Sequence, residues 1–135
     1  MKYRKDKYGN DLSILGFGCM RFQQKAGRID LEEAEREILL AVNSGVNYFD
    51  TAPVYLQGTS ERVTGNALKR HPRENYFIAT KLSNMRGNNS FEEAIGMYKK
   101  SFEELQTDYI DYYLLHNIGD GAAFDRRFKD NGVID

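Results

Sequence analysis

The sequence predicts an α/β fold built on a parallel sheet, and three observations lead to this prediction. Short apolar runs rich in aromatic and β-branched residues alternate with segments whose apolar residues recur at helical spacing. The apolar runs are nearly continuous, as in strands that are covered on both faces. No linker or change in composition interrupts the 135 residues, so the alternation belongs to one domain with right-handed crossovers between its strands.

The first elements are a hairpin and a short strand. Residues 1–13 are predicted to form a hairpin because Tyr8-Gly9-Asn10-Asp11 is typical of a turn. The run ILGFGCM at 14–20 follows, and it is predicted to be the first buried strand, with Gly16 and Gly18 allowing a tight turn where the strand ends.

A helix is predicted over residues 30–45. Asp30 is its expected N-cap, Glu33 would complete a capping box, and Gly45 would end it. The apolar positions at helical spacing are Leu31, Ala34, Ile38, Leu39 and Val42.

The same alternation of apolar strands and capped helices repeats along the rest of the chain. The helix after the third strand has Ser90 three residues before Glu93, the pattern of a second capping box. Its expected apolar stripe includes Phe91, Tyr98 and Phe102. The remaining expected elements are strands over 46–52, 76–83 and 108–117, helices over 59–72 and 90–108, and the start of another helix within 118–135.

Composition excludes several classes of function. The chain has 19 Lys and Arg against 20 Asp and Glu, so it lacks the single-sign field that attracts nucleic acid or an anionic membrane. Cys19 is the one cysteine, which rules out a disulfide or a cysteine-based zinc site within the chain. No apolar run is long enough to span a membrane, and the first twenty residues lack the apolar core of a signal peptide. We expect a cytoplasmic protein that acts on a small molecule.

Polar side chains close three successive predicted strands. Asp50 ends the second strand, Lys81 the third and His116 the fourth, at intervals of 31 and 35 residues. Each interval is about the length of one strand-helix unit, so these side chains should meet at the carboxyl-terminal rim of adjacent parallel strands. Barrels and doubly wound sheets both bind ligands at that rim. Asp108 and Asp111 should lie at the opposite rim, where a role in stability is expected.

The chemical types at this rim suit proton transfer. Tyr55 lies in the loop after Asp50, and a free phenol is a slow proton donor near neutral pH. An adjacent ammonium such as Lys81 would stabilise the phenolate, and Asp50 would hold that ammonium in place. His116 would donate a hydrogen bond to a substrate oxygen. Such a set could protonate a carbonyl oxygen while a hydride reaches its carbon. The alternative is that these polar residues mark strand ends and do not act together.

Four segments in order, GFGCMRF, GVNYFDTAPVY, YFIATKL and LQTDYIDYYLLH, resemble the first four strands of the aldo/keto reductases, which are (β/α)8 TIM barrels. The resemblance implies that Tyr55 is the general acid or base, that Lys81 and Asp50 tune it, and that His116 orients the carbonyl of an aldehyde or ketone. It implies a nicotinamide cofactor, usually NADPH with NADH possible, near Asp50 and the backbone of Gly18, Cys19 and Met20. The ending YLLHNIGD resembles a bacterial branch that often carries an iron-sulfur segment, but no ligands for a cluster or other metal are expected here.

The resemblance also implies an incomplete barrel. Residues 1–13 would be a hairpin cap, and residues 14–135 would form the first four β/α units, with the fourth helix incomplete. Two unpaired sheet edges invite self-association, and the fragment alone is expected to be inactive. Two alternatives of other classes stay open: a non-catalytic relative that senses cofactor, and a half-barrel module of which two copies close one barrel. The sequence does not predict which carbonyl compound is bound.

Overall fold

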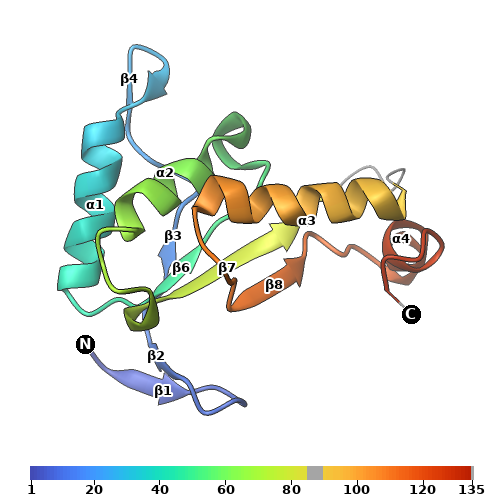
Figure 1. Ribbon diagram of the computed structural model, residues 1–135, viewed down its shortest axis with the longest axis horizontal. Coiled ribbons are helices and arrows are strands. Elements are labelled where there is room, and N and C mark those ends of the chain that lie inside the picture. Colours follow the sequence, from blue (N-terminus) through green and yellow to red (C-terminus); the bar gives the residue numbers. More distant parts are fainter. Residues whose placement is uncertain (85–89, 135) are drawn as a thin grey trace.

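The computed structural model describes residues 1–84 and 90–134. Its centre is a four-stranded, wholly parallel sheet with the strand order β3-β6-β7-β8 (Figure 1), which confirms the predicted α/β class as a partial barrel. The strands are β3 (Phe17–Gly18), β6 (Tyr48–Asp50), β7 (Phe77–Leu82) and β8 (Tyr112–Leu115).

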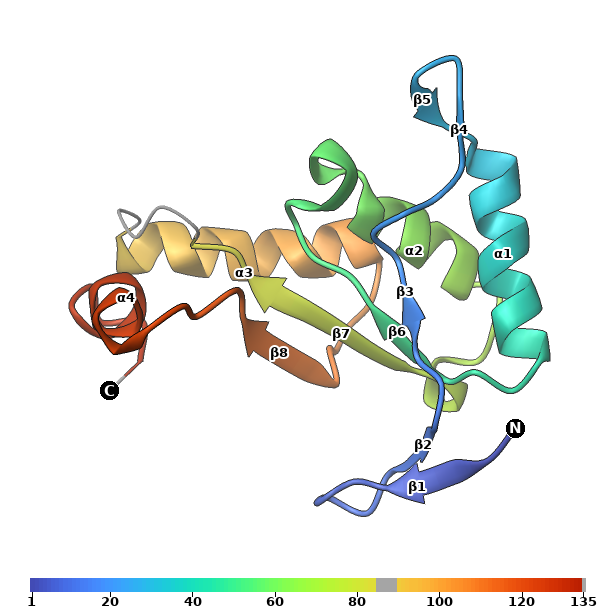
Figure 2. The same cartoon turned by 180° about the vertical axis from the view of Figure 1, so that it is seen from behind.

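Three helices cover one face of this sheet, as the two opposite views show (Figures 1 and 2). They are α1 (Leu31–Asn43), α2 (Ser60–Leu68) and α3 (Phe91–Leu105). The core lies between the helices and the sheet, because burial of apolar side chains from both layers is the main stabilising term. Its largest fully buried members are Phe49, Ile78, Ile38, Leu68 and Leu105.

The shorter elements lie at the ends of the sheet. The hairpin of β1 and β2 lies near the amino ends of the strands, and α4 lies beyond the carboxyl end of β8 (Figure 1). These elements are β1 (Tyr3–Lys5), β2 (Asp11–Ser13), β4 (Gln24–Lys25), β5 (Arg28–Ile29), α4 (Gly121–Phe124), the 3-10 helices η1 (Tyr55–Gly58) and η2 (Arg73–Asn75), and the π-helix η3 (Asp125–Lys129).

The helix ends follow local chemistry, with one exception. At α3 both halves of the predicted capping box form: Ser90 Oγ accepts from the N–H of Glu93, and the Glu93 carboxylate accepts from the N–H of Ser90. At α1 the Asp30 side chain accepts from the N–H of Glu33 as predicted. The Glu33 carboxylate instead pairs with Arg36 Nε at 2.8 Å and the N–H of Asp30 donates to Gln23, so the capping box predicted at Asp30 is not completed. A bidentate guanidinium is the stronger partner for an exposed carboxylate.

Side-chain alternation sorts the strand residues between the two faces of the sheet. Phe49, Ile78, Thr80 and Leu82 are buried, and the first two belong to the core under the helices. The alternate residues of β6 and β7, and the β8 residues that pair with them, therefore point to the face that the three helices leave uncovered. Those residues are Tyr48, Asp50, Phe77, Ala79, Lys81, Tyr112 and Leu114.

The amino-terminal hairpin contacts the amino end of β8. The hydroxyl of Tyr112 donates to Asp6 at 2.5 Å, and Asn10 donates to the same hydroxyl at 3.2 Å. These bonds join residues about a hundred positions apart in the sequence. The hairpin within residues 1–13 therefore lies at the amino-terminal end of the sheet, away from the ends that carry Asp50 and Lys81.

Two expectations about individual segments were wrong, and one element was missed. Ile14 and Leu15 are exposed because the N–H of Ile14 bonds to Lys2 and continues the first hairpin, so the first sheet strand is only Phe17–Gly18. Phe91 and Tyr98 in α3, and Leu31 in α1, are exposed. The hairpin of β4 and β5 was not predicted, although its turn has positive φ at Ala26 and Gly27, the conformation that two-residue hairpin turns require.

A mostly buried arginine joins η2 to the segment before β8. Arg73 Nη2 donates to Asp111 Oδ2 at 2.6 Å, its other nitrogens bond Thr107 and the carbonyl of Tyr76, and the guanidinium lies 3.8 Å from the ring centroid of Tyr109. Replacing Arg73 with Lys is expected to lower the free energy of unfolding by about 2–3 kcal/mol, because an ammonium cannot reproduce this fork. Denaturant unfolding measures the change.

The matched control is the Lys5–Asp11 pair, whose side chains are each 64% exposed. Lys5→Ala is expected to change the same free energy by no more than about 0.5 kcal/mol. Equal losses in the two variants would contradict the stabilising role given to Arg73.

Candidate active site

The carboxyl ends of β6, β7 and β8 bring the four predicted catalytic side chains together. Asp50 is the last residue of β6, Lys81 the next to last of β7, and His116 the first after β8. Tyr55 begins η1, five residues after Asp50. Strand pairing fixes this arrangement, since Asp50 lies opposite Ala79 and Lys81 opposite Leu114 on the uncovered face.

Lys81 is the centre of the group. Its Nζ donates to Asp50 Oδ1 at 2.5 Å and to the carbonyl of Thr51 at 2.7 Å, and it lies 4.8 Å from the centroid of the Tyr55 ring. The Lys81 side chain is 12% exposed and that of Asp50 33%. Partial removal from water strengthens the attraction between the two charges. The ammonium is thereby held beside the phenol.

A sharp turn after Tyr55 delivers its ring to this position. Leu56 and Gln57 both have left-handed backbone angles, with φ of 51° and 56°. Two consecutive non-glycine residues in this region store strain of about 1–2 kcal/mol each. Leu56 offsets part of this cost by packing against the buried core.

His116 completes the group from the neighbouring strand. Its ring meets the Tyr55 ring edge to face, with centroids 5.5 Å apart and planes at 85°. Its Nδ1 lies 2.8 Å from Ser83 Oγ. Burial lowers the pKa of His116 from its usual value of 6.5, and the Lys81 ammonium lowers it further against the opposing effect of Asp50. The imidazole is therefore neutral at neutral pH.

This lowered pKa predicts a pH dependence of stability. Below pH 6.5 the unfolded chain takes up the His116 proton more readily than the folded chain, so folding stability is present above that pH and is lost as pH falls through the folded pKa. His116→Gln removes this contribution. Acidification from pH 7 is expected to cost the unmodified chain more stability in denaturant unfolding than it costs the variant. An equal loss in both would contradict the lowered pKa.

The segment predicted to approach a cofactor lies beside Asp50. Gly18 pairs with Asp50 across β3 and β6, and a side chain at Gly18 would meet no atom within 4 Å. Met20 is exposed. Cys19 is fully buried, its N–H donates to Asp50 and its carbonyl accepts from Ser60. Burial raises the pKa of the Cys19 thiol to about 12, which makes it unreactive.

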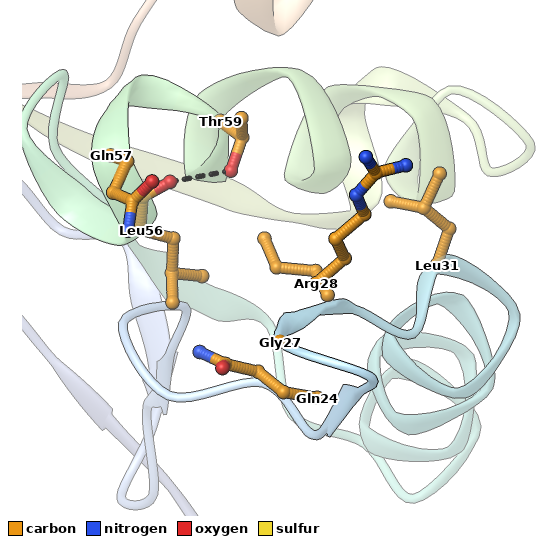
Figure 3. Close-up of a pocket in the computed structure, with 8 residues that line it drawn as sticks. Gln24, Gly27, Arg28, Leu31, Leu56, Gln57 and Thr59 are labelled. Atoms are coloured by element: carbon orange, nitrogen blue, oxygen red, sulfur yellow. Dashed lines mark hydrogen bonds between the residues drawn. The ribbon is translucent and has the colours of Figure 1, made fainter.

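A cavity of about 370 Å³ lies between the β4–β5 hairpin, the start of α1 and η1 (Figure 3). Leu56 and Gln57, which follow Tyr55, contribute to its wall together with Thr59, whose hydroxyl donates to the carbonyl of Leu56. None of the four predicted catalytic residues lines it. In the described part of the chain, no cluster of three metal-ligating side chains and no helix able to cross a membrane is found.

Sequence reasoning missed two residues that contact His116. Ser83 follows Lys81 by two positions, so strand alternation alone could have placed it on the same face. Arg127 of η3 donates to the carbonyl of His116 at 2.7 Å and is 5% exposed. No sequence signal links it to His116, because the contact depends on how η3 folds back.

Comparisons with known proteins agree on one family. The model described as "Aldo/keto reductase family" matches residues 14–123. The uncharacterized oxidoreductase YqkF of Bacillus subtilis is 34% identical over 97% of this chain and 46% of its own length. The holo form of aldo-keto reductase AKR11C1 from Bacillus halodurans is 35% identical, with a TM-score of 0.72 over 99% of this chain and 48% of that one.

A Klebsiella pneumoniae aldo-keto reductase in complex with NADPH is 25% identical, with a TM-score of 0.68 over 96% of this chain and 46% of that one. The chain thus spans less than half the length of these relatives.

Proposed function

The chain belongs to the aldo/keto reductase family, and we propose that it supplies the proton-transfer residues for NAD(P)H-dependent reduction of an aldehyde or ketone to an alcohol. One observation carries this proposal: the Lys81 ammonium, paired with Asp50, lies against the Tyr55 ring, and the His116 ring meets the same ring edge to face.

The proposed roles follow from charge. When bound, a reduced nicotinamide supplies a hydride to the carbonyl carbon. Negative charge then develops on the carbonyl oxygen, and the Tyr55 hydroxyl donates its proton there, which completes the alcohol. Lys81 stabilises the phenolate left behind, and Asp50 keeps the ammonium in position. His116, neutral at pH 7, orients the carbonyl by a hydrogen bond.

The residues at this rim fit a nicotinamide cofactor in two respects. Gly18 leaves open space beside Asp50, so a flat group could approach the backbone closely. Asp50 gives one oxygen to Lys81 and remains partly exposed, so its carboxylate can also accept from a ribose hydroxyl. We propose NADPH first, because the Klebsiella relative is in complex with NADPH, and NADH as the alternative.

The proposal also covers what completes the barrel. β3 and β8 are the edges of the four-stranded sheet, whereas a closed family barrel has eight strands. We propose that residues 1–13 cap the barrel, that residues 14–135 form its first four units, and that turnover requires partner strands on both edges. Self-association would supply them if two copies combine. A solution mass of twice 15.6 kDa is expected in that case, and a stable monomer would contradict it.

The experiment that tests the function separates binding from turnover. Nicotinamide fluorescence is titrated with NADPH and NADH, and a panel of aldehydes and ketones is then screened by loss of nicotinamide absorbance. Binding with turnover is expected once partner strands close the barrel. Binding without turnover would favour a cofactor-sensing relative. The absence of both binding and turnover would contradict both assignments.

A further inference from the structure

The buried Ser83 and the half-buried His116 form a side-chain pair at the ends of β7 and β8. Ser83 Oγ lies 2.8 Å from His116 Nδ1, and Ser83 is 9% exposed. A neutral imidazole carries its hydrogen on one of its two nitrogens, and the bond made by one nitrogen decides the state of the other. The direction of this single hydrogen bond therefore fixes what Nε2 can do.

The surroundings of Ser83 determine that direction. A hydroxyl has one hydrogen to donate, and a buried donor without an acceptor is costly. Among the described residues, His116 Nδ1 is the only hydrogen-bond partner of Ser83 Oγ. If Nδ1–H donated to Ser83, the serine hydrogen would have no acceptor among the described residues. This favours a hydroxyl that donates to Nδ1, with the imidazole hydrogen on Nε2.

We propose that Ser83 is a positioning residue that holds His116 as the Nε2–H tautomer, so that Nε2 can donate to a substrate oxygen. The catalytic purpose of this arrangement rests on the proposed function, whereas the tautomer itself does not. Ser83 touches neither the proposed proton donor Tyr55 nor Lys81 in any recorded hydrogen bond, so it acts only through His116.

Arg127 holds the main chain around His116 independently of Ser83. Its guanidinium donates to the carbonyls of His116, Asn117 and Asn84, and Asn84 Nδ2 donates back to the carbonyl of Arg127. Asn117 has a left-handed φ of 53°, so the chain turns sharply directly after His116. Because this clamp holds the main chain, removal of the serine hydroxyl releases the imidazole ring alone.

Nitrogen NMR of the imidazole side chains tests the tautomer without any activity measurement. The chain has two histidines, and His71 at the end of α2 lies in another part of the fold and serves as an internal reference. In the unsubstituted chain at neutral pH, the His116 signals are expected to show an unprotonated Nδ1 and a protonated Nε2. Ser83→Ala should shift the tautomer ratio by about tenfold, the effect of one hydrogen bond.

Two further variants make the result specific. Ser83→Thr keeps the hydroxyl and is expected to restore the tautomer. Ser44→Ala makes the same chemical change at the exposed end of α1 and is expected to leave both histidines unchanged. A hydrogen on Nδ1 in the unsubstituted chain, or an unchanged ratio in Ser83→Ala, would overturn the proposal.

The kinetic test is made in the closed barrel that turns over. Ser83→Ala is expected to lower kcat for carbonyl reduction about tenfold with cofactor affinity unchanged, and Ser83→Thr should recover most of it. A shifted tautomer with unaltered kcat would overturn the positioning role while the proposed function stands. If Tyr55→Phe leaves kcat unaltered, the proton-donor role proposed for Tyr55 fails and the NMR result alone decides whether Ser83 sets the tautomer.

Discussion

Replacing Tyr55 with Phe is expected to lower kcat for carbonyl reduction in the closed barrel by about 10²–10⁴-fold, the usual contribution of a general acid. The phenyl ring can keep its contacts with the Lys81 ammonium and the His116 ring, because both contacts are with the ring and not with the hydroxyl. Only the transferable proton is removed. Steady-state kinetics and a cofactor fluorescence titration on the same sample measure the two effects.

Cofactor affinity should be unchanged in this variant, since the residues proposed to meet the cofactor lie at the ends of β3 and β6 and directly after β3. Tyr109→Phe is the matched control: it removes a phenol hydroxyl from the opposite end of the sheet, where the ring stacks on Arg73. The control should keep full activity. A Tyr55→Phe barrel with unaltered kcat would remove Tyr55 from proton transfer and leave its ring as a packing element.

Replacing Gly65 with Ala is expected to lower the free energy of unfolding by about 3 kcal/mol or more, and the melting temperature by about 10 °C. Gly65 faces the end of α3, and a Cβ there would approach the backbone of Leu105 closer than 3.0 Å. Backbone atoms cannot turn aside as a side chain can. The variant must therefore separate α2 from α3 at a contact next to the fully buried Leu68 and Ala67.

Gly96 in the middle of α3 provides the control. A Cβ at Gly96 meets no atom within 4 Å, and the residue is exposed. Gly96→Ala is expected to raise the free energy of unfolding by about 0.5–1 kcal/mol, because alanine restricts the unfolded chain and favours the helix. Thermal unfolding of the two variants should move in opposite directions. A Gly65→Ala chain as stable as the parent would refute the close helix approach.

Local signals in the sequence were sufficient for the order and type of the main elements. The helices at Asp30 and Ser90 were predicted from caps whose hydrogen bonds span three residues, and both caps form. The shared rim of Asp50, Lys81 and His116 was predicted from the spacing of strand-helix units, and strand register brings the three side chains to one face. Such features depend on period and spacing, which a sequence displays directly.

Features that join distant segments could not be read in this way. The contact of Gly65 with Leu105 and the bond of Arg127 to the His116 carbonyl depend on how closely two elements approach in space. The capping partner expected for Glu33, the N–H of Asp30, donates to the carbonyl of Gln23 instead, and the Glu33 carboxylate pairs with Arg36.

By itself, the sequence determined a parallel α/β chain and the chemical types at its carboxyl-terminal rim, since residue type and periodicity are local properties. The tertiary structure alone decided that the Lys81 ammonium lies against the Tyr55 ring and that Ser83 bonds His116. The physical reason is that distances between side chains on different strands follow from sheet pairing, turn geometry and helix packing acting together.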